Sequence, residues 1–277
     1  MSLLLEARNI SKVFTSGGFG QQQRTVAVDR VTLNLSSDTG SIVALAGESG
    51  SGKTTLGRIL LGLETPTEGE VLYRGNNLTK LGRQDRKTFR REVQAIFQDP
   101  FSSLNPRMLV GDIIQEPLDL HTNLSEKEKR EKVTWLLEKV GLSAEQATRY
   151  PHEFSGGQRQ RIGIARSLAT EPKVIIADEP VSALDVSIQA QVINLMMDLQ
   201  DEFDLTILFI AHDLSVVNHI STEIAVMYLG EVVEYNTTEK IFNNPQHQYT
   251  KTLLAAIPQP NPDGRDERIK KRQELNS

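Results

Sequence analysis

Nine residues in the first quarter of the chain determine the kind of core it can build. They read Gly-Glu-Ser-Gly-Ser-Gly-Lys-Thr-Thr over positions 47–55 and follow the apolar run 42–46. Apolar residues then recur at helical spacing, at Leu56, Ile59, Leu60 and Leu63. This residue pattern, between a strand and a helix, is typical of a phosphate-binding loop. A surface turn rich in glycine and serine is the alternative, but it would not explain the flanking strand and helix.

The residue types of this loop suit the terminal phosphates of a nucleotide. Its glycines let the backbone turn sharply, so that N–H groups converge on phosphate oxygens at the start of a helix. Lys53 supplies a cation for those phosphates, and Thr54 supplies a hydroxyl where a bridging Mg²⁺ would sit. The expected nucleotide-binding residues are Gly47, Glu48, Ser49, Gly50, Ser51, Gly52, Lys53, Thr54 and Thr55.

Two adjacent carboxylates indicate the rest of the phosphate site. Asp178 and Glu179 follow the apolar run 174–177, and the carboxyl ends of strands in an α/β sheet face the crevice where ligands bind. Asp178 can there hold Mg²⁺ directly or through a water, which completes the metal site begun by Thr54. Glu179 is placed to orient or deprotonate the water that attacks the γ-phosphate. The alternative is that the pair only caps the turn before Pro180.

The segment Ser-Gly-Gly-Gln at 155–158 opens another helix with small residues. A helix N-terminus presents free N–H groups and the positive end of a dipole, which together favour an anion. The loop around Lys53 already wraps the phosphates of one nucleotide. We therefore expect Ser155, Gly156, Gly157 and Gln158 to serve a nucleotide held by another subunit.

Apolar runs alternate with helical patterns along the chain. The runs 174–177 and 205–210 are continuously apolar, which predicts a parallel sheet covered on both faces. Short runs within 3–14 and 26–35 predict a small N-terminal sheet. The residues 110–150 are rich in helix formers and predict an inserted helical lobe. The expected fold class is α/β: a P-loop NTPase core with a RecA-like mixed or parallel sheet, a small N-terminal antiparallel β subdomain and an inserted α-helical subdomain.

Composition excludes several other classes of protein. The net charge is −5 over 277 residues and the isoelectric point is about 5.7, so we expect no nucleic acid as partner. Cysteine is absent, which excludes disulfides, thiolate metal sites and cysteine nucleophiles. The N-terminal residues lack the apolar core of a signal peptide, and no run approaches the ~20 apolar residues that cross a bilayer. Any membrane role is therefore expected to come through partner subunits.

Three segments are expected at the surface. The basic run 80–92 is interrupted by acidic residues and reads as a solvated helix face. The segment 16–23 is rich in glycine and glutamine and reads as a flexible loop. The residues from Pro258 onward hold three prolines and many charges, so we expect a loosely held tail.

Taken together and in this order, the motifs resemble those of the ATPase subunit of an ATP-binding-cassette transporter. The resemblance covers about residues 3–258. The motifs are the loop 47–55, Gln98, the signature 155–158, Asp178-Glu179, Ser182-Ala183-Leu184-Asp185 and His212. The resemblance implies ATP and Mg²⁺ as cofactors, and an ATPase that powers import through a membrane permease.

The resemblance also assigns roles to single positions. Phe14 resembles the aromatic that stacks on adenine, with a core phenylalanine as the alternative. Gln98 resembles the glutamine that senses the metal and the attacking water, and His212 resembles the switch histidine at the γ-phosphate. Asp185 resembles a residue of the dimer interface that communicates between two sites. The expected catalytic residues are Glu179, His212 and Gln98. The expected metal-site residues are Thr54, Gln98 and Asp178.

Two further segments resemble the importers of oligopeptides, dipeptides and nickel. One is Phe-Ser-Ser-Leu-Asn-Pro at 101–106, and the other is Asn-Pro-Gln-His-Gln-Tyr-Thr at 244–250. The chain departs from the family pattern at Phe154, where leucine is usual, and at Gln248, where proline is usual. Some relatives carry an iron–sulfur cluster on tail cysteines, which this chain cannot do.

Partners, location and domain limits follow from the same resemblance. The expected partners are integral membrane permease subunits, a second ATPase subunit that is either identical or different, and indirectly an extracytoplasmic solute-binding protein. The expected location is the cytoplasmic face of the inner or plasma membrane. The ATPase domain is expected at 1–258, with its core at about 1–98 and 166–240 and its helical subdomain at about 99–165. A C-terminal extension and tail are expected at 241–277.

Alternatives to this interpretation differ in cargo and in class. Oligopeptide or dipeptide is the expected cargo, and nickel or another metal chelate is the nearest alternative. A chromosome or repair ATPase would need a long coiled coil, whereas only about 120 residues separate Lys53 from Asp178. A subunit that binds without hydrolysis would not need Glu179 or His212. A phosphate-loop kinase or GTPase would not explain the segment 155–158.

Overall fold

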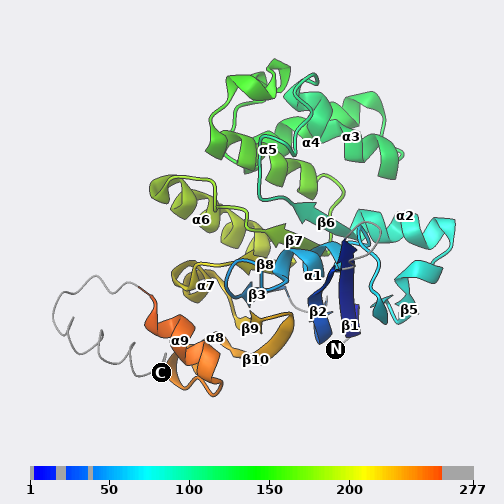
Figure 1. Cartoon of the computed structure of the whole chain (residues 1–277). Helices are drawn as coiled ribbons and strands as arrows, with labels where there is room; N and C mark the ends of the chain where they lie inside the picture. Colours follow the sequence, from blue (N-terminus) through cyan, green and yellow to red (C-terminus); the bar gives the residue numbers. More distant parts are fainter. Residues whose placement is uncertain (1–2, 17–22, 37–39, 258–277) are drawn as a thin grey trace.

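The computed structural model describes residues 3–16, 23–36 and 40–257. The predicted flexible loop falls mostly on residues 17–22 and the predicted tail on residues 258–277, and both of these stretches lie outside the described residues. The N-terminal part forms a four-stranded antiparallel sheet in the order β2-β1-β4-β5 (Figure 1). Its strands are β1 (Leu3–Ser16), β2 (Gln23–Ser36), β4 (Glu68–Tyr73) and β5 (Asn76–Asn77). The predicted N-terminal antiparallel subdomain is confirmed.

A six-stranded mixed sheet in the order β10-β9-β3-β8-β7-β6 forms the centre of the molecule. Five of its strands run parallel, and β10 pairs antiparallel at one edge. The strands are β3 (Ser41–Ala46), β6 (Val93–Ile96), β7 (Val174–Asp178), β8 (Thr206–Ala211), β9 (Glu223–Tyr228) and β10 (Glu231–Thr237). The predicted mixed or parallel sheet is therefore confirmed.

Burial on both faces of the central sheet explains the apolar run 207–210 in β8. In β8, Ile207 and Phe209 belong to one buried cluster, while Leu208 and Ile210 belong to a second cluster. Successive side chains of a strand point to opposite faces, so both faces of this sheet are buried. The second cluster also holds side chains of α1 (Lys53–Leu60) and of β1, which places α1 between the two sheets.

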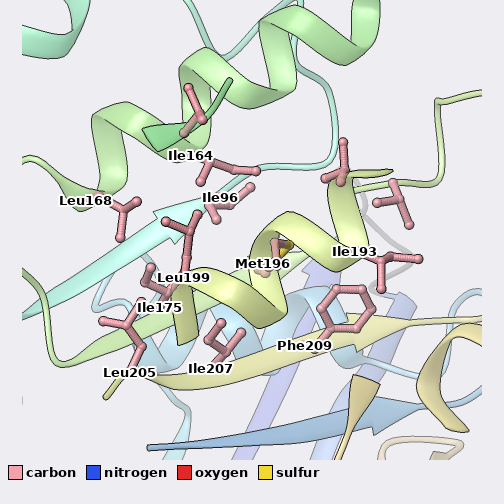
Figure 2. Close-up of a cluster of buried hydrophobic side chains, with 14 of the residues drawn as sticks. Ile96, Ile164, Leu168, Ile175, Ile193, Met196, Leu199, Leu205, Ile207 and Phe209 are labelled. Atoms are coloured by element: carbon pink, nitrogen blue, oxygen red, sulfur yellow. The ribbon is translucent and has the colours of Figure 1, made fainter. Parts of the chain in front are cut away.

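The opposite face of the sheet is covered by α6 (Val186–Phe203) and α7 (Leu214–Ile220). In Figure 2, Ile193, Met196 and Leu199 of α6 lie over Phe209 and its neighbours on the strands. This face of α6 is therefore part of the core.

The helix after the phosphate-binding loop is shorter than the spacing of the apolar residues 56–63 suggested. Helix α1 ends at Leu60, and Gly62 has a positive φ of 66°. A glycine in the left-handed conformation stops a helix. Leu63 consequently lies outside the helix and is 55% exposed, so its expected place on the helical face was wrong.

Three helices form a lobe at one end of the molecule (Figure 1). They are α3 (Val110–His121), α4 (Glu126–Lys139) and α5 (Gly156–Leu168), joined through the short turns η2 (Ala144–Thr148) and η3 (Pro151–Glu153). Ser125 begins α4 with a capping box that includes Glu128, which satisfies N–H groups at the helix start. The residues Val133, Leu136, Leu137 and Val140 are buried.

The remaining helices lie toward the ends of the two sheets. Helix α2 (Arg83–Glu92) buries Phe89 and exposes Arg83, Arg86, Lys87, Arg90 and Arg91, which confirms the predicted solvated face. It follows η1 (Leu78–Lys80). The C-terminal helices α8 (Thr238–Asn243) and α9 (Gln248–Ala255) lie next to β9 and β10 (Figure 1). None of the helices in the described ranges is long and apolar enough to span a bilayer.

Candidate active site

The phosphate-binding loop connects the end of β3 to the start of α1. Gly47, Gly50 and Gly52 have positive φ values of 155°, 83° and 105°. A Cβ atom on Gly47 would lie 2.1 Å from the carbonyl oxygen of Met227, and one on Gly52 would lie 2.0 Å from that of Ala27. Both positions therefore require glycine for two reasons: a side chain would clash with neighbouring backbone, and the φ value disfavours other residues. Without side chains there, the loop stays open for a ligand.

Lys53 is turned inward at the start of α1. Its Nζ donates to the carbonyl oxygens of Gly47 at 2.8 Å and Glu48 at 2.7 Å. Burial lowers the pKa of Lys53, and the nearby carboxylates of Glu179, Asp178 and Glu48 oppose that shift. Lys53 Nζ also donates to Ser51 Oγ at 3.4 Å. A desolvated ammonium whose hydrogen-bond partners are neutral is suited to bind a phosphate, because an anion would offset the cost of its burial.

Thr54 and Asp178 meet at the end of β7, as the sequence indicated. Thr54 Oγ1 donates to Asp178 Oδ1 at 3.0 Å. Burial raises the pKa of Asp178 above its ordinary value, and the hydrogen bond from Thr54 opposes this. A hydroxyl and a carboxylate are hard oxygen donors of the kind that Mg²⁺ prefers.

This pair fits a metal that is shared with phosphate rather than enclosed by protein. Among the residues that the structure describes, no group of three or more His, Cys, Asp or Glu side chains could hold a metal ion. Mg²⁺ usually keeps waters and takes substrate phosphates as ligands beside one or two protein oxygens. Thr54 and Asp178 are thus the residues that would hold Mg²⁺.

The three expected catalytic side chains converge on one carboxylate. Gln98 Nε2 donates to Glu179 Oε2 at 3.0 Å, and His212 Nδ1 lies 3.3 Å from the same oxygen. These residues follow β6, β7 and β8, three adjacent strands of the central sheet. Gln98 lies two residues beyond β6, which ends at Ile96.

The backbone at Glu179 is strained. Its φ is 44°, in the left-handed region that residues other than glycine rarely adopt, and its N–H donates to the carbonyl oxygen of Ile210 at 3.0 Å. Strain of this kind is concentrated at functional sites. It re-aims the chain at the end of β7 and directs the carboxylate toward Gln98 and His212.

Ser182 is a neighbour of this cluster that the sequence did not single out by itself. Gln98 Nε2 lies 3.4 Å from Ser182 Oγ, whose hydroxyl also donates to the carbonyl oxygen of Glu179 at 3.1 Å. A cavity of about 60 Å³ is lined by Glu179, Ser182 and His212 among others, which is room for water. A larger cavity of about 730 Å³ lies elsewhere, between α3 and α4, and contains none of these residues.

The segment 155–158 begins α5, and its own side chains accept hydrogen bonds from backbone N–H groups at the helix N-terminus. Ser155 Oγ accepts the Gln158 N–H at 3.3 Å, and Gln158 Oε1 accepts the Ser155 N–H at 3.0 Å. Ser155 is exposed, and so is Asp185 at the start of α6. The hydrogen bonds found in the described part of the chain do not connect the segment 155–158 with the loop around Lys53.

Helices α5 and α6 meet closely near these two N-termini. A Cβ on Gly157 would lie 2.3 Å from Ile188 Cγ2, and one on Gly156 would lie 3.5 Å from Leu184 Cδ2. The two exposed N-termini are therefore held in a fixed relation on the surface.

Phe14 lies near the end of β1. Its side chain is 42% exposed, and Lys12 Nζ lies 5.0 Å from the centre of its ring. The alternative of a buried core phenylalanine was therefore wrong. An exposed ring can stack on a planar base.

Two family models match the chain. The model described as ABC transporter matches residues 30–182, and the model described as oligopeptide/dipeptide transporter, C-terminal region, matches residues 233–277.

Curated relatives match over nearly the whole chain. The dipeptide transport ATP-binding protein DppF of Haemophilus influenzae is 54% identical over 99% of this chain and 84% of its own length. The protein of the same name in Escherichia coli is 53% identical over 99% of this chain and 82% of its length. The oligopeptide transport ATP-binding protein OppF of Streptococcus mutans is 52% identical over 97% of this chain and 86% of its length.

Solved structures match the fold. The ATP-binding cassette MJ0796, in a dimeric post-hydrolysis state bound to ADP and Pi, aligns with a TM-score of 0.74 at 30% identity. That alignment covers 84% of this chain and 98% of the cassette. CbiO1 of Clostridium perfringens, part of the transporter complex cbiONQ, aligns with a TM-score of 0.75 at 24% identity over 98% of this chain and 100% of its own, which supports the fold alone.

Proposed function

This chain belongs to the ABC transporter family, and from that premise we propose that it couples ATP hydrolysis to the import of an oligopeptide or dipeptide through a membrane permease. One observation carries the catalytic part of the proposal: the carboxylate of Glu179 is held by Gln98 and His212 beside the pair Thr54 and Asp178. The similarity to dipeptide and oligopeptide transport ATP-binding proteins supports the cargo class.

The loop 47–55 binds the phosphates of ATP, and residues at the ends of the central strands bind the metal and the attacking water. The N–H groups of the loop 47–55 and the ammonium of Lys53 bind the phosphates at the start of α1. Thr54 and Asp178 would hold Mg²⁺, and Gln98, which bonds to Glu179, would sense the metal and the attacking water. When bound, Mg²⁺ supplies positive charge that offsets the charge developing on the transferred phosphoryl group. Phe14 stacks on the adenine.

Glu179 orients and deprotonates the attacking water. Gln98 donates to its carboxylate, which leaves the other oxygen of the carboxylate available to accept from water. We assign to His212, which approaches the same carboxylate oxygen as Gln98, the contact with the γ-phosphate. The three side chains follow the ends of adjacent strands, so the pairing of those strands in the central sheet brings them together.

The signature 155–158 acts on ATP bound by a second subunit. Its helix N-terminus is exposed at Ser155, and Asp185 lies at the neighbouring N-terminus of α6. Two such subunits, identical or different, would close with each signature facing the other's phosphate loop. Closure adds contacts to ATP that the open state lacks, so ATP binding favours the closed state.

The proposed assembly lies on the cytoplasmic face of the inner or plasma membrane. Integral permease subunits would dock on the helical lobe, and an extracytoplasmic solute-binding protein would act indirectly through them. We assign the ATPase domain to residues 1–258, with its core at about 1–98 and 166–240, its helical subdomain at about 99–165 and the extension at 241–277.

Uptake by the assembled transporter tests the proposed function. The chain would be reconstituted in vesicles with its permease, its solute-binding protein and any second ATPase, and uptake of a labelled dipeptide would be followed with ATP on the cytoplasmic side. We expect uptake that requires ATP and is lost with Lys53→Ala in this chain. Uptake of a nickel chelate but of no peptide would contradict the cargo class, and ATP-independent uptake would contradict the coupling.

A further inference from the structure

The phosphate-binding loop is bonded to the C-terminal helix α9. The Glu48 N–H donates to the hydroxyl oxygen of Tyr249 at 3.0 Å, although the two residues are 201 positions apart. Tyr249 belongs to the segment 244–250, which the ATPase chemistry leaves without a role. This hydrogen bond connects that segment directly to the loop.

Three contacts hold the Tyr249 side chain and the turn before it. Its ring stacks on Tyr228 with 4.0 Å between ring centres and 28° between ring planes. The carboxylate of Glu234, on β10, accepts the N–H groups of Gln246 at 2.8 Å and His247 at 3.0 Å. His247 Nδ1 accepts the N–H of Tyr249 at 3.2 Å and so caps α9. The hydroxyl is therefore positioned by an ordered scaffold before any ligand binds.

Tyr249 and Lys53 hold opposite sides of the same peptide group. The carbonyl oxygen of Gly47 accepts from Lys53 Nζ at 2.8 Å, and the N–H of the same peptide, at Glu48, donates to Tyr249. The ammonium of Lys53 has three N–H donors, and a bound phosphate would compete with the loop carbonyls for them. The bond to Tyr249 does not depend on Lys53, so it can keep this peptide oriented when the lysine turns to a nucleotide.

Among the residues that the structure describes, no other side chain from outside the loop bonds to this peptide. The turn after β9 bonds the far side of the loop, where the Gly230 N–H donates to the carbonyl oxygen of Ser51 at 3.0 Å. Met227 limits Gly47 by contact, because its carbonyl oxygen would be 2.1 Å from an added Cβ. Tyr249 is thus the side chain that fixes the hydrogen-bonding direction of the Gly47–Glu48 peptide from outside the loop.

We propose that Tyr249 is a positioning residue for the phosphate-binding loop, through which the C-terminal region of the chain sets the affinity of the site for ATP. The proposal rests on the proposed ATPase function. It assigns the segment 244–250 a role in the nucleotide site. Tyr228 and Glu234 orient Tyr249 and the turn before it, and the Tyr249 hydroxyl orients the Gly47–Glu48 peptide of the loop.

The substitution Tyr249→Phe tests the proposal, because it removes the hydroxyl and keeps the ring that stacks on Tyr228. Tyr235→Phe on β10 is the matched control, since it also removes one hydroxyl, which donates to Glu223 at 2.7 Å and not to the loop. We expect Tyr249→Phe to weaken Mg-ATP binding about two- to tenfold, the size of one lost hydrogen bond. In the assembled transporter, KM for ATP should rise more than kcat falls. Tyr235→Phe should change neither by more than about twofold.

Hydrogen exchange separates positioning from a general loss of stability. In Tyr249→Phe, amide exchange in the peptide that contains Glu48 should become faster, while exchange in β8 and the unfolding temperature should stay at wild-type values. Unchanged exchange at Glu48 with unchanged or tighter ATP binding would overturn the proposal. Faster exchange throughout the chain would also overturn it, because Tyr249 would then be only a packing residue. A wild-type chain that binds no ATP would instead contradict the proposed function.

Discussion

Glu179 combines a strained backbone with a carboxylate that two neighbours hold. Its φ of 44° would be relaxed in glycine, and Gln98 and His212 approach the same carboxylate oxygen. A strained residue persists only when its surroundings determine its conformation, and here the N–H of Glu179 is bonded to Ile210. We therefore propose that hydrolysis depends on Glu179.

Glu179→Gln should bind ATP as the wild type does and hydrolyse it at least about 100-fold more slowly, because the amide cannot accept the proton of the attacking water. The measurements are ATP affinity and steady-state hydrolysis, with dimer formation in ATP followed by light scattering. The exposed Glu239→Gln on α8 is the control and should leave all three unchanged. Undiminished hydrolysis by Glu179→Gln would show that Glu179 is not the base.

Residues of this site differed in how far sequence could identify them. The loop 47–55 and the pair Asp178-Glu179 have fixed spacing relative to a strand and a helix, so their chemistry could be predicted from local pattern. The roles of Gln98 and His212 needed a family resemblance, because a glutamine or histidine after a strand has no distinctive spacing. Tyr249 could not be predicted at the loop, since its contact depends on how α9 packs against β9.

Among the elements, α5 shows how a small residue sets a helix contact. Gly157 packs against Ile188 of α6, where a Cβ would come within 2.3 Å of Ile188 Cγ2. Gly163 lies in the same helix with nothing within 4 Å of an added Cβ. One glycine is required by packing, and the other is not.

Gly157→Ala should lower the free energy of unfolding by about 1–3 kcal/mol, because α5 and α6 must separate to admit the methyl group. Gly163→Ala should raise it by about 0.5–1 kcal/mol, since alanine favours a helix interior over glycine. Denaturant unfolding of both variants measures the difference. Equal effects of the two substitutions would contradict close packing at Gly157.

The N-terminal sheet is tied to α2 by a polar cluster. Glu92 accepts from the Tyr73 hydroxyl at 2.6 Å and from Arg74 at 2.8 Å. Burial raises the pKa of Tyr73 to about 12, so its hydroxyl remains a donor. Burial alone would raise the pKa of Glu92, but the hydrogen bonds from Tyr73 and Arg74 hold it below its ordinary value.

A carboxylate with a lowered pKa stabilises the fold above the pKa of the unfolded chain, and that stability is lost as the pH falls through the lowered value. Glu92→Gln should therefore reduce the unfolding temperature at pH 7, and the difference from wild type should shrink in acid. Thermal unfolding of both proteins from pH 7 to about pH 3 measures this. A difference that stays constant or grows on acidification would contradict the role of the charge.

The sequence predicted which segments are strands or helices more accurately than it predicted the residues at which they begin and end. The continuously apolar strands follow from burial on both faces, and the sequence carries that pattern directly. Limits depend on single residues, as where Gly62 ends α1 before Leu63 and where β6 stops before Gln98. The edge strand β10 is mostly only partly buried, so its pattern is weaker, and it was not predicted.

At the scale of the whole molecule, the single chain leaves its signature segment exposed. Ser155 at the start of α5 makes no hydrogen bond to the loop around Lys53 in the described part of the chain, and Asp185 at the start of α6 is also exposed. A composite site, in which this segment faces a nucleotide held by a second subunit, would account for that exposure. We therefore propose that two subunits complete each nucleotide site.

Ser155→Arg should leave ATP binding to the isolated chain unchanged and reduce hydrolysis by the assembled complex to the level without partners, because the added side chain blocks closure. Equilibrium binding of a fluorescent ATP analogue and hydrolysis by the complex measure the two effects. Arg83→Ala, on the exposed start of α2, is the control and should change neither. Loss of ATP binding in the isolated Ser155→Arg chain would count against a role in trans.

The most direct test of composite sites is the rate of ATP hydrolysis per chain over a range of chain concentrations, first alone and then with the permease and any second ATPase. We predict a rate per chain that rises with concentration, or that appears only when the partners are added. A rate per chain that is constant, in a preparation proven monomeric by light scattering, would mean that each chain completes its own site and would contradict the account.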